Sequence, residues 1–473
     1  MSFNPKVDIA VRTALSLIPT AGDTISIMLG TAQYGPINEV ITCTNFNEVL
    51  NVFQEDVDTH TTILKGAELF FSNGGAILKV VRVADATAAI AAYSANGPVE
   101  TGVITFSAKY KGTYGNNISV DIDAMGTGRI ARIKINNTVE LFDNNGATNG
   151  YTTNALLVAA INDSSEIATA VVNDADLVSA LSSYAQFIDG LSGTTATSLI
   201  YTTAFDNILL DEDWSILMIP NTYQTVSIED TDAFQTTISA KVVNRSDIYN
   251  KQGIFVSGIS DDETITIAQT RTTRDERFIL AAPSIEHTSR TTGDSEYLDG
   301  TYLACALSGQ ISKLDALGNA VTRKVVVVND LSVLVSSGKK YYNSVEIEQL
   351  LSAGICCASR INNELKWARG ITRVTDTSSI YFEINILRIV DNIKDLIRST
   401  LDDYLGEPTS QITRDRMQAV VNGVLNQQES VGLITEYLPT VVTEGVSPDT
   451  VTVAVSIKPA YATNFINVTI TVS

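Results

Sequence analysis

The side chains best suited to acid–base and metal chemistry are scarce, because the 473 residues include only two histidines, His60 and His287. His60 lies just before a predicted helix and His287 lies in the segment SIEHTSR, so we expect a surface or helix-capping position for each. Acidic clusters at 211–213 (DED) and 261–263 (DDE) could bind a cation, but no further ligands follow at the spacing of a calcium-binding loop. We therefore predict solvated loops there, with no catalytic and no metal-binding residue.

The four cysteines follow no spacing that is typical of a zinc site. Free, buried thiols in a reducing compartment are the favoured interpretation for Cys43, Cys305, Cys356 and Cys357. A disulfide between the adjacent Cys356 and Cys357 would be strained and is the less favoured alternative.

Three arginines form the one notable basic cluster. The segment TRTTRDERF places Arg271, Arg274 and Arg277 near one face of a predicted helix, beside Asp275 and Glu276. Two interpretations stay open: a salt-bridged surface, and a patch that contacts another protein.

Motifs for nucleotide binding and nucleophilic catalysis are missing from the sequence. The glycines of FSNGGAILKV follow a predicted helix, whereas a phosphate-binding loop leads from a strand into a helix. No P-loop and no G-x-S-x-G motif occurs. We therefore predict no cofactor and no enzyme activity, although 53 acidic residues leave carboxylate chemistry as an alternative.

The overall charge points away from nucleic acid. Fifty-three acidic and 32 basic residues give a net charge of −21, whereas nucleic-acid binding needs clustered Lys and Arg. No apolar run approaches the roughly 18–20 residues needed to span a bilayer. The first residues, MSFNPKVDIAVRTALSLIPTAG, lack the pattern of a secretion signal. We expect a protein that is made in a cytoplasm and kept there or released by lysis.

Strands and helices alternate in much of the chain, which indicates an α/β domain with a largely parallel sheet. TISIMLGTAQYGP predicts a buried strand, TNFNEVLNVF a helix, and TTILKGAELFFSNGGAILKVVRV a helix followed by a strand. DWSILMIP, KQGIFVSGIS and ERFILAAPSI continue the pattern. Between them the sequence is rich in Ala, Thr, Ser, Asn and Gly, and NNISVDID and RIARIKIN alternate like strands. The predicted class is therefore α/β and α+β multidomain, an α/β core with an inserted β-rich domain and terminal β-strand arms.

Both ends of the chain alternate apolar and polar residues, which is typical of half-buried strands. Near the start, the apolar positions are Val7, Ile9 and Val11; at the end, they are Ile466, Val468, Ile470 and Val472. A preceding segment, VTVAVSI at 451–457, has the same pattern. Between these ends, YFEINILRIVDNIKDLIRSTLDDYLGEP and ITRDRMQAVVNGVLNQQ are predicted helices. We predict an N-terminal arm at 1–20, an α/β domain at 21–88 and 200–345, the inserted β-rich outer domain at 89–199, and a C-terminal domain with its arm at 346–473.

The order of several stretches resembles the tail sheath proteins of contractile phages, especially those of Gram-positive hosts and their defective-prophage relatives. The opening strand with its Gly-Pro turn, GGAILKVVRV, and the paired terminal strands around a central proline are similar to that family. In AKYKGTYGNNISVDI, the family's Gly-aromatic-Gly-Asn motif is matched by Gly112, Tyr114, Gly115 and Asn116. Family members often have Pro where Lys111 stands and Trp where Tyr114 stands.

The resemblance implies a structural subunit without catalysis. Such subunits stack as hexameric rings into a helical sheath around a tail tube, and contraction drives the tube through the host envelope for genome ejection. The implied partners are other copies of the chain, the tail tube protein, and baseplate and tail terminator proteins. The implied location is the virion tail, assembled in the host cytoplasm, with no direct nucleic-acid contact and no membrane insertion.

The resemblance also implies roles for particular residues. The terminal arms of sheath proteins exchange as strands between neighbours, and we expect residues 466–472 to be the donated segment. An ordinary hairpin within one subunit is the alternative. The long helix at 383–405 resembles the element that faces the tube, so Arg388, Lys394 and Arg398 are candidate contacts to tube acids.

Other functions stay open at this point. The sheath of a phage-derived bacteriocin or another contractile injection system would share the fold. An α/β enzyme with a β-rich insertion predicts a cleft with converging polar groups. A different self-assembling shell protein predicts sheets or closed shells instead of tubes.

Overall fold

A computed structural model describes residues 24–464, except 55–60, 98–100, 137, 176, 182, 194–195, 221–227, 261–262, 289, 291–292, 314–317 and 448. Two compact units divide the chain. The first contains the described residues of Met1–Met28, Gly66–Lys79 and Leu210–Ser473, and the second consists of Leu29–Lys65 and Val80–Leu209. The boundaries between the units fall within strands β1 and β3.

The large sheet has the order β18-β17-β13-β12-β11-β1-β3-β2. Its strands are β1 (Ile25–Gly30), β2 (Val40–Cys43), β3 (Ile77–Arg82), β11 (Ile216–Met218), β12 (Ile254–Gly258), β13 (Phe278–Ala282), β17 (Ile355–Ile361) and β18 (Glu364–Trp367). From β1 through β11, β12 and β13 to β17 the pairing is parallel, as predicted. Every residue of β12 and β13 is buried, because a parallel sheet is covered on both faces and its strands become apolar throughout.

Helices of the first unit include α5 (Ile228–Ile248), α6 (Ile265–Thr270), α7 (Gly300–Lys313) and α8 (Ser344–Ser352), together with most of α2 (Ile63–Ser72). Of these, α5, α7 and α8 contact strands of the large sheet, and α6 packs on α8. α7 is buried on all sides between Gly300 and Ser312 and contacts β11, β12 and β13. A small sheet, β14 (Ser284–Thr288) with β15 (Ser295–Leu298) and β16 (Asp330–Ser332), completes this part.

The second unit contains β2, α1 (Phe46–Phe53) and two antiparallel sheets. One sheet has the order β10-β6-β7-β8, with β6 (Ile118–Met125), β7 (Gly128–Ile135), β8 (Thr138–Phe142) and β10 (Ala185–Gln186). The other is β4 (Ala92–Ala95), β5 (Ile104–Ala108) and β9 (Ala168–Val172), and α3 (Asn154–Ser164) packs on β9. A common core that includes Phe106, Val120, Ile133 and Phe187 lies between these elements.

The Gly-aromatic-Gly-Asn motif has a clear structural reason. Gly112 has φ +144°, and a Cβ there would lie 1.8 Å from the carbonyl oxygen of Gln33. Tyr114 is buried against the ring of Tyr34, with ring centroids 5.8 Å apart. Asn116 donates from Nδ2 to the carbonyl of Gly190 and accepts from the Gly190 N–H at 2.8 Å. The motif therefore holds residues 112–116 against the segments around Tyr34 and Gly190 within the second unit.

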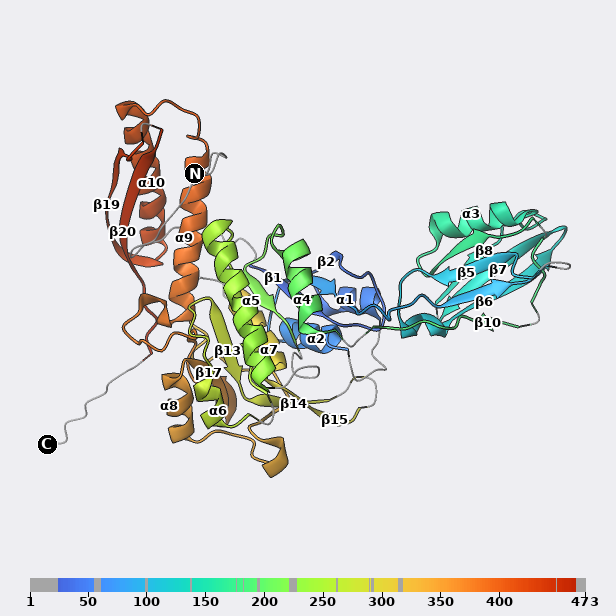
Figure 1. The fold of residues 1–473 in the computed structure, drawn as a ribbon, viewed down its shortest axis with the longest axis horizontal. Helices are drawn as coiled ribbons and strands as arrows, with labels where there is room; N and C mark the ends of the chain where they lie inside the picture. The colour runs from blue at the N-terminus through green and yellow to red at the C-terminus, as the bar shows by residue number, and fades with distance from the viewer. Residues whose placement is uncertain are drawn as a thin grey trace. The chain divides into compact units, whose positions relative to one another are not determined.

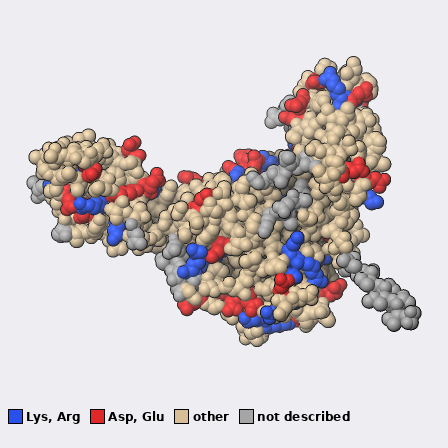
Figure 2. Space-filling model, turned by 180° about the vertical axis from the view of Figure 1, so that it is seen from behind, with Lys and Arg blue, Asp and Glu red and all other residues tan. Residues whose placement is uncertain are grey.

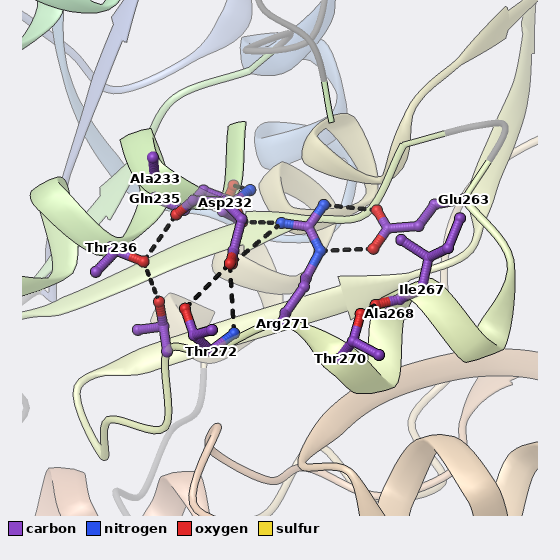
Figure 3. A network of polar contacts seen from close by, with 12 residues as sticks. Asp232, Ala233, Gln235, Thr236, Glu263, Ile267, Ala268, Thr270, Arg271 and Thr272 are labelled. Atoms are coloured by element: carbon purple, nitrogen blue, oxygen red, sulfur yellow. Dashed lines mark hydrogen bonds and ion pairs between the residues drawn. The ribbon is translucent and has the colours of Figure 1, made fainter. Parts of the chain in front are cut away.

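The arginine cluster does not lie on one helical face, which corrects the sequence prediction. α6 ends at Thr270, so Arg271 caps that helix while Arg274 and Arg277 belong to the connection into β13. Arg271 is buried, and its Nε and Nη2 each donate to a carboxylate oxygen of Glu263 at 2.6 Å, as Figure 3 shows. Its Nη1 donates to Oε1 of Gln235 at 2.7 Å. Arg271 is therefore paired inside the subunit.

His287 is also buried rather than at the surface or at a helix cap, since it is 8% exposed in the middle of β14. Its Nδ1 lies 3.1 Å from Oε1 of Glu296, and its Nε2 lies 3.4 Å from Oε2 of Glu68. Burial alone would lower its pKa, but the hydrogen bonds to Glu296 and Glu68 raise the pKa to about 9. The imidazolium therefore connects β14 to both α2 and β15 at neutral pH.

This contact predicts a pH-dependent stability. Because the pKa of His287 rises from about 6.5 on folding, its contribution is fully present below pH 6.5 and is lost as pH rises through about 9. The expected size is on the order of 2–3 kcal/mol. Thermal unfolding of the parent and His287→Gln proteins should differ most near pH 6.5 and converge by pH 10. A constant difference across this range would contradict the doubly paired imidazolium.

Candidate assembly surface in the C-terminal region

Helix α9 (Ile384–Asp402) has two parts with different surroundings. From Ile384 to Asp391 every residue is buried, polar residues included. Further along, Ile393, Ile397 and Leu401 recur at helical spacing and form a core with Val421 and Leu425 of α10 (Gln411–Ser430). α9 therefore connects the α/β sheet to a separate C-terminal layer (Figure 1).

Arginine contacts attach α9 to the rest of the first unit. Arg277, just before β13, holds Asp391 through two parallel hydrogen bonds of 2.7 and 2.8 Å. Burial alone would lower the pKa of Arg277, but the Asp391 carboxylate raises it. Arg388 donates to the carbonyl of Ile311 at 2.8 Å and to the hydroxyl of Thr24 at 2.9 Å. These contacts hold α9 to residues just before β13 and β1 and to α7.

A β-hairpin covers the C-terminal layer. β19 (Ile434–Glu444) pairs antiparallel with β20 (Val451–Pro459), and both pack on α10 and α9. Val453, Val455 and Ile457 face this core, whereas the intervening residues of β20 are exposed. On the outer face Leu438 is 57% exposed and Val441 is 56% exposed. The hairpin is half-buried, as the alternation at 451–457 predicts.

The hairpin is a sheet of two strands in the described part of the chain, so each strand has one edge without a strand partner there. The edge of β19 is interrupted: the register shifts between Leu438 and Val441, Pro439 has no N–H, and the N–H of Thr440 donates to Oδ1 of Asn422. The edge of β20 runs from Val451 to Lys458 without a proline. β20 is therefore the better template for an added strand.

The chain that follows β20 is held by a contact that the sequence did not indicate. Asn464 donates from Nδ2 to Oε1 of Glu383 at 2.6 Å, and the same oxygen accepts from Nη2 of Arg369 at 2.7 Å. Glu383 is the residue before α9. A lone asparagine in a loop carries no signal for this role, because its partner lies far away in the sequence.

Comparison with known proteins identifies this region. Residues 376–473 match the family model of the phage tail sheath C-terminal domain. The C-terminal region is therefore similar to a tail sheath domain, and we refer to residues 376–473 as the sheath domain because of this likeness. No curated protein matches the chain.

Solved structures extend the likeness to nearly all of the chain. The sheath tail protein of Listeria innocua aligns with a TM-score of 0.70 and 15% identity over 95% of this chain and 94% of its own. The sheath tail protein of Desulfitobacterium hafniense gives a TM-score of 0.65 and 14% identity over 95% of this chain and 100% of its own. The helical sheath of the anti-feeding prophage in its contracted state aligns with a TM-score of 0.55 and 13% identity. That alignment covers 100% of this chain and 99% of its own. The chain has the tail sheath fold, which confirms the predicted family resemblance and fold class.

The predicted tube-facing cations take different positions on α9 of the sheath domain. Arg388 is 8% exposed, burial lowers its pKa to about 10, and its guanidinium donates to Ile311 and Thr24 inside the first unit. Lys394 is half-buried, and burial lowers its pKa. Arg398 donates to the carbonyl of Asn250 at 2.6 Å and to Asp395 at 2.9 Å. A tube contact through this helix stays a prediction.

Several predicted sites fall outside the residues that the structure describes. The arm residues Val7, Ile9, Val11, Ile466, Val468, Ile470 and Val472, together with His60, Asp261 and Asp262, lie outside the described residues. All four cysteines are buried free thiols, as predicted. In the acidic segment 211–213, Glu212 pairs with Lys79 at 2.6 Å. Within the described part of the chain, no three His, Cys, Asp or Glu side chains gather as a possible metal site.

The surface beyond the sheath domain offers no strongly basic region on the side shown in Figure 2, where Lys and Arg side chains have Asp and Glu side chains close to them. No helix in the described residues is both long enough and apolar enough to cross a membrane.

Proposed function

We propose that the chain is a structural subunit of a contractile tail sheath, which polymerises around a tail tube and contracts to drive the tube through a host envelope. The observation that carries this proposal is the open hairpin of the sheath domain. β20 offers an uninterrupted edge, and the sequence supplies alternating apolar segments at both ends of the chain that could be added to it. Strand addition gives affinity through backbone hydrogen bonds and register through alternate side chains.

The partners proposed are other copies of the chain in hexameric rings, the tail tube protein, and baseplate and tail terminator proteins. Residues 466–472 are the proposed donated strand, and seven residues reach roughly 23 Å at about 3.3 Å each. The buried contacts of Arg277 and Arg388 hold α9 to other elements of the first unit, which supports contraction by subunits that move as rigid bodies. The proposed location is the virion tail, which is assembled in the host cytoplasm. Contraction of that tail serves genome ejection.

A second candidate is the sheath of a phage-derived bacteriocin or another contractile injection system. The likeness to the anti-feeding prophage sheath favours it, since that alignment covers all of this chain. The two candidates share one subunit mechanism and differ in the particle that carries it. An α/β enzyme and a different shell protein are less well supported by a sheath domain at residues 376–473.

The proposal is tested by expressing the full chain, alone and with its tube protein, beside a version that ends at Ala462. Negative-stain electron microscopy should show hollow striated tubes for the full chain and none for the shortened one. Tubes from both proteins would keep the sheath but reject residues 466–472 as the donated strand. Closed shells, or no polymer from the full chain even with the tube protein, would contradict the sheath function.

A further inference from the structure

The path of the chain after β20 is defined by its contacts with neighbouring elements. Glu444, at the end of β19, pairs with Arg414 near the start of α10 at 2.9 Å, so β19 runs antiparallel to α10. β20 returns in the opposite direction, and Pro459 lies opposite Ile434 at the base of the hairpin. The N–H of Ala460 still donates to the carbonyl of Leu433 at 2.9 Å. Beyond this bond the chain leaves the hairpin.

Five residues after the end of β20, Asn464 is bound at the start of α9. Its amide donates to Glu383, whose carboxylate is held by Arg369, and the guanidinium of Arg369 lies over the ring of Phe382 with 4.9 Å to the centroid. The Glu383 side chain is 7% exposed. Hydrogen bonds to a charged, enclosed carboxylate are stronger than those between neutral groups. We refer to the contact of Arg369, Glu383 and Asn464 as the exit clasp.

The exit clasp has hydrogen-bonding capacity left over. Oε2 of Glu383 and Oδ1 of Asn464 are both buried, and neither has a hydrogen-bond partner in the described part of the chain. Buried acceptors of this kind are rare, and they are normally satisfied by a backbone N–H, another donor or water. Both acceptors belong to the exit clasp, so the clasp can accept further hydrogen bonds from a backbone N–H, another donor or water.

Without the clasp, a competing structure is available to the same residues. A fold-back at 460–465 would add residues 466–472 to the subunit's own β20. Val468 would then lie opposite Ile457 and Ile470 opposite Val455, so the apolar residues would share the inner face. A segment on so short a linker has an effective concentration on the order of millimolar. At about 10 µM protein, the fold-back would therefore be favoured roughly 100-fold over addition to another copy.

We propose that the exit clasp directs the C-terminal segment away from its own hairpin and so keeps the edge of β20 open for a second copy of the chain. This inference rests on the proposed strand exchange and names the residues that make it intermolecular. Residue 464 stands two positions before Ile466, so the clasp fixes the point, at the residue before α9, from which residues 466–472 depart. Asn464 and Glu383 act as positioning residues for the assembly strand.

The test compares Asn464→Asp with Thr463→Asp in the full chain at pH 7.5. The first change places a second carboxylate against Glu383 and opens the clasp, whereas the second adds the same charge at an exposed neighbour without a contact to Glu383. Light scattering should show a critical concentration for polymerisation at least tenfold higher for Asn464→Asp and unchanged for Thr463→Asp. Asn464→Ala removes the amide without adding charge and should also raise the critical concentration.

A disulfide measurement shows whether residues 466–472 pair with the hairpin of their own subunit. Cysteines introduced at Ser456 and Thr469 would lie opposite each other in the fold-back, and the four native cysteines are buried and do not compete. At nanomolar dilution, internal crosslinking should rise at least tenfold when Asn464→Asp is added and stay low with Thr463→Asp. Equal crosslinking and equal critical concentrations in all variants would reject the proposed role of the exit clasp. The proposed sheath function would not be affected by that result. Failure of the parent chain to assemble with its tube protein would instead reject the proposed function.

Discussion

Replacing Asp391 by alanine is expected to lower the free energy of unfolding by about 3–5 kcal/mol, because it leaves a buried guanidinium without its carboxylate. The side chain of Arg277 is 3% exposed, and both of its terminal nitrogens bind Asp391. The carbonyl of Gly253 and Oε1 of Gln252 also accept from Arg277, but neither carries a charge. Neutral acceptors cannot compensate the buried cation, so the loss should be large.

Chemical denaturation followed by circular dichroism measures this change. Asp395→Ala is the matched control on the same helix, since Asp395 pairs with Arg398 at 2.9 Å but its side chain is 52% exposed. An exposed pair of this kind is worth about 0–1 kcal/mol. Replacing Arg277 and Asp391 together by methionine and leucine should recover most of the loss, because no buried charge is left. Similar losses for Asp391→Ala and Asp395→Ala would contradict the role given to the buried pair.

Periodic elements were predictable from the sequence because their signal is local. The apolar spacing from Ile386 to Leu401 predicted α9, and the alternation at 451–457 predicted β20. Both elements are long enough for the period to be counted, and both bury their periodic apolar residues. The parallel sheet followed in the same way from apolar strands separated by helices.

Contacts between distant residues were not predictable. Arg271, Arg274 and Arg277 have helical spacing, but α6 is only six residues long and ends before all three. Arg271 donates to Gln235 and Arg277 donates to Asp391, and only folding brings these partners together. His287 was expected at the surface for the same reason, since Glu68 lies on a different helix. Burial of a charged residue depends on such partners and not on its neighbours in sequence.

Strand exchange through the chain ends stays a prediction, and the sequence did not indicate which edge would accept the added strand. The alternation of the terminal segments indicated strands that need a partner, and the described hairpin has an edge that could accept one. The interruption of β19 at Pro439 favours the other edge, a choice that depends on which strand the proline occupies. The contact of Asn464 with Glu383 left no trace in the sequence pattern.

Adding charge to one face of the C-terminal segment is expected to abolish sheath assembly, while the same charge on the other face should be tolerated. Val468→Asp with Ile470→Asp places two carboxylates on the apolar face, which would meet the side of the hairpin lined by Val453, Val455 and Ile457. Burying two unpaired charges costs several kcal/mol for each subunit contact. Assembly multiplies that cost along the polymer, so striated tubes should be absent at any accessible protein concentration.

Asn467→Asp with Thr469→Asp is the matched control, because it adds the same net charge to the same segment on its polar face. This protein should form tubes, with a critical concentration raised no more than a fewfold by charge repulsion, an effect that salt should reduce. Strand addition requires this asymmetry, since neighbouring side chains of a strand point to opposite faces. Equal loss of tubes from both variants would mean that charge, and not register, governs the contact. Tubes from both would mean that residues 466–472 do not enter a sheet, and the edge of β20 would then need another occupant.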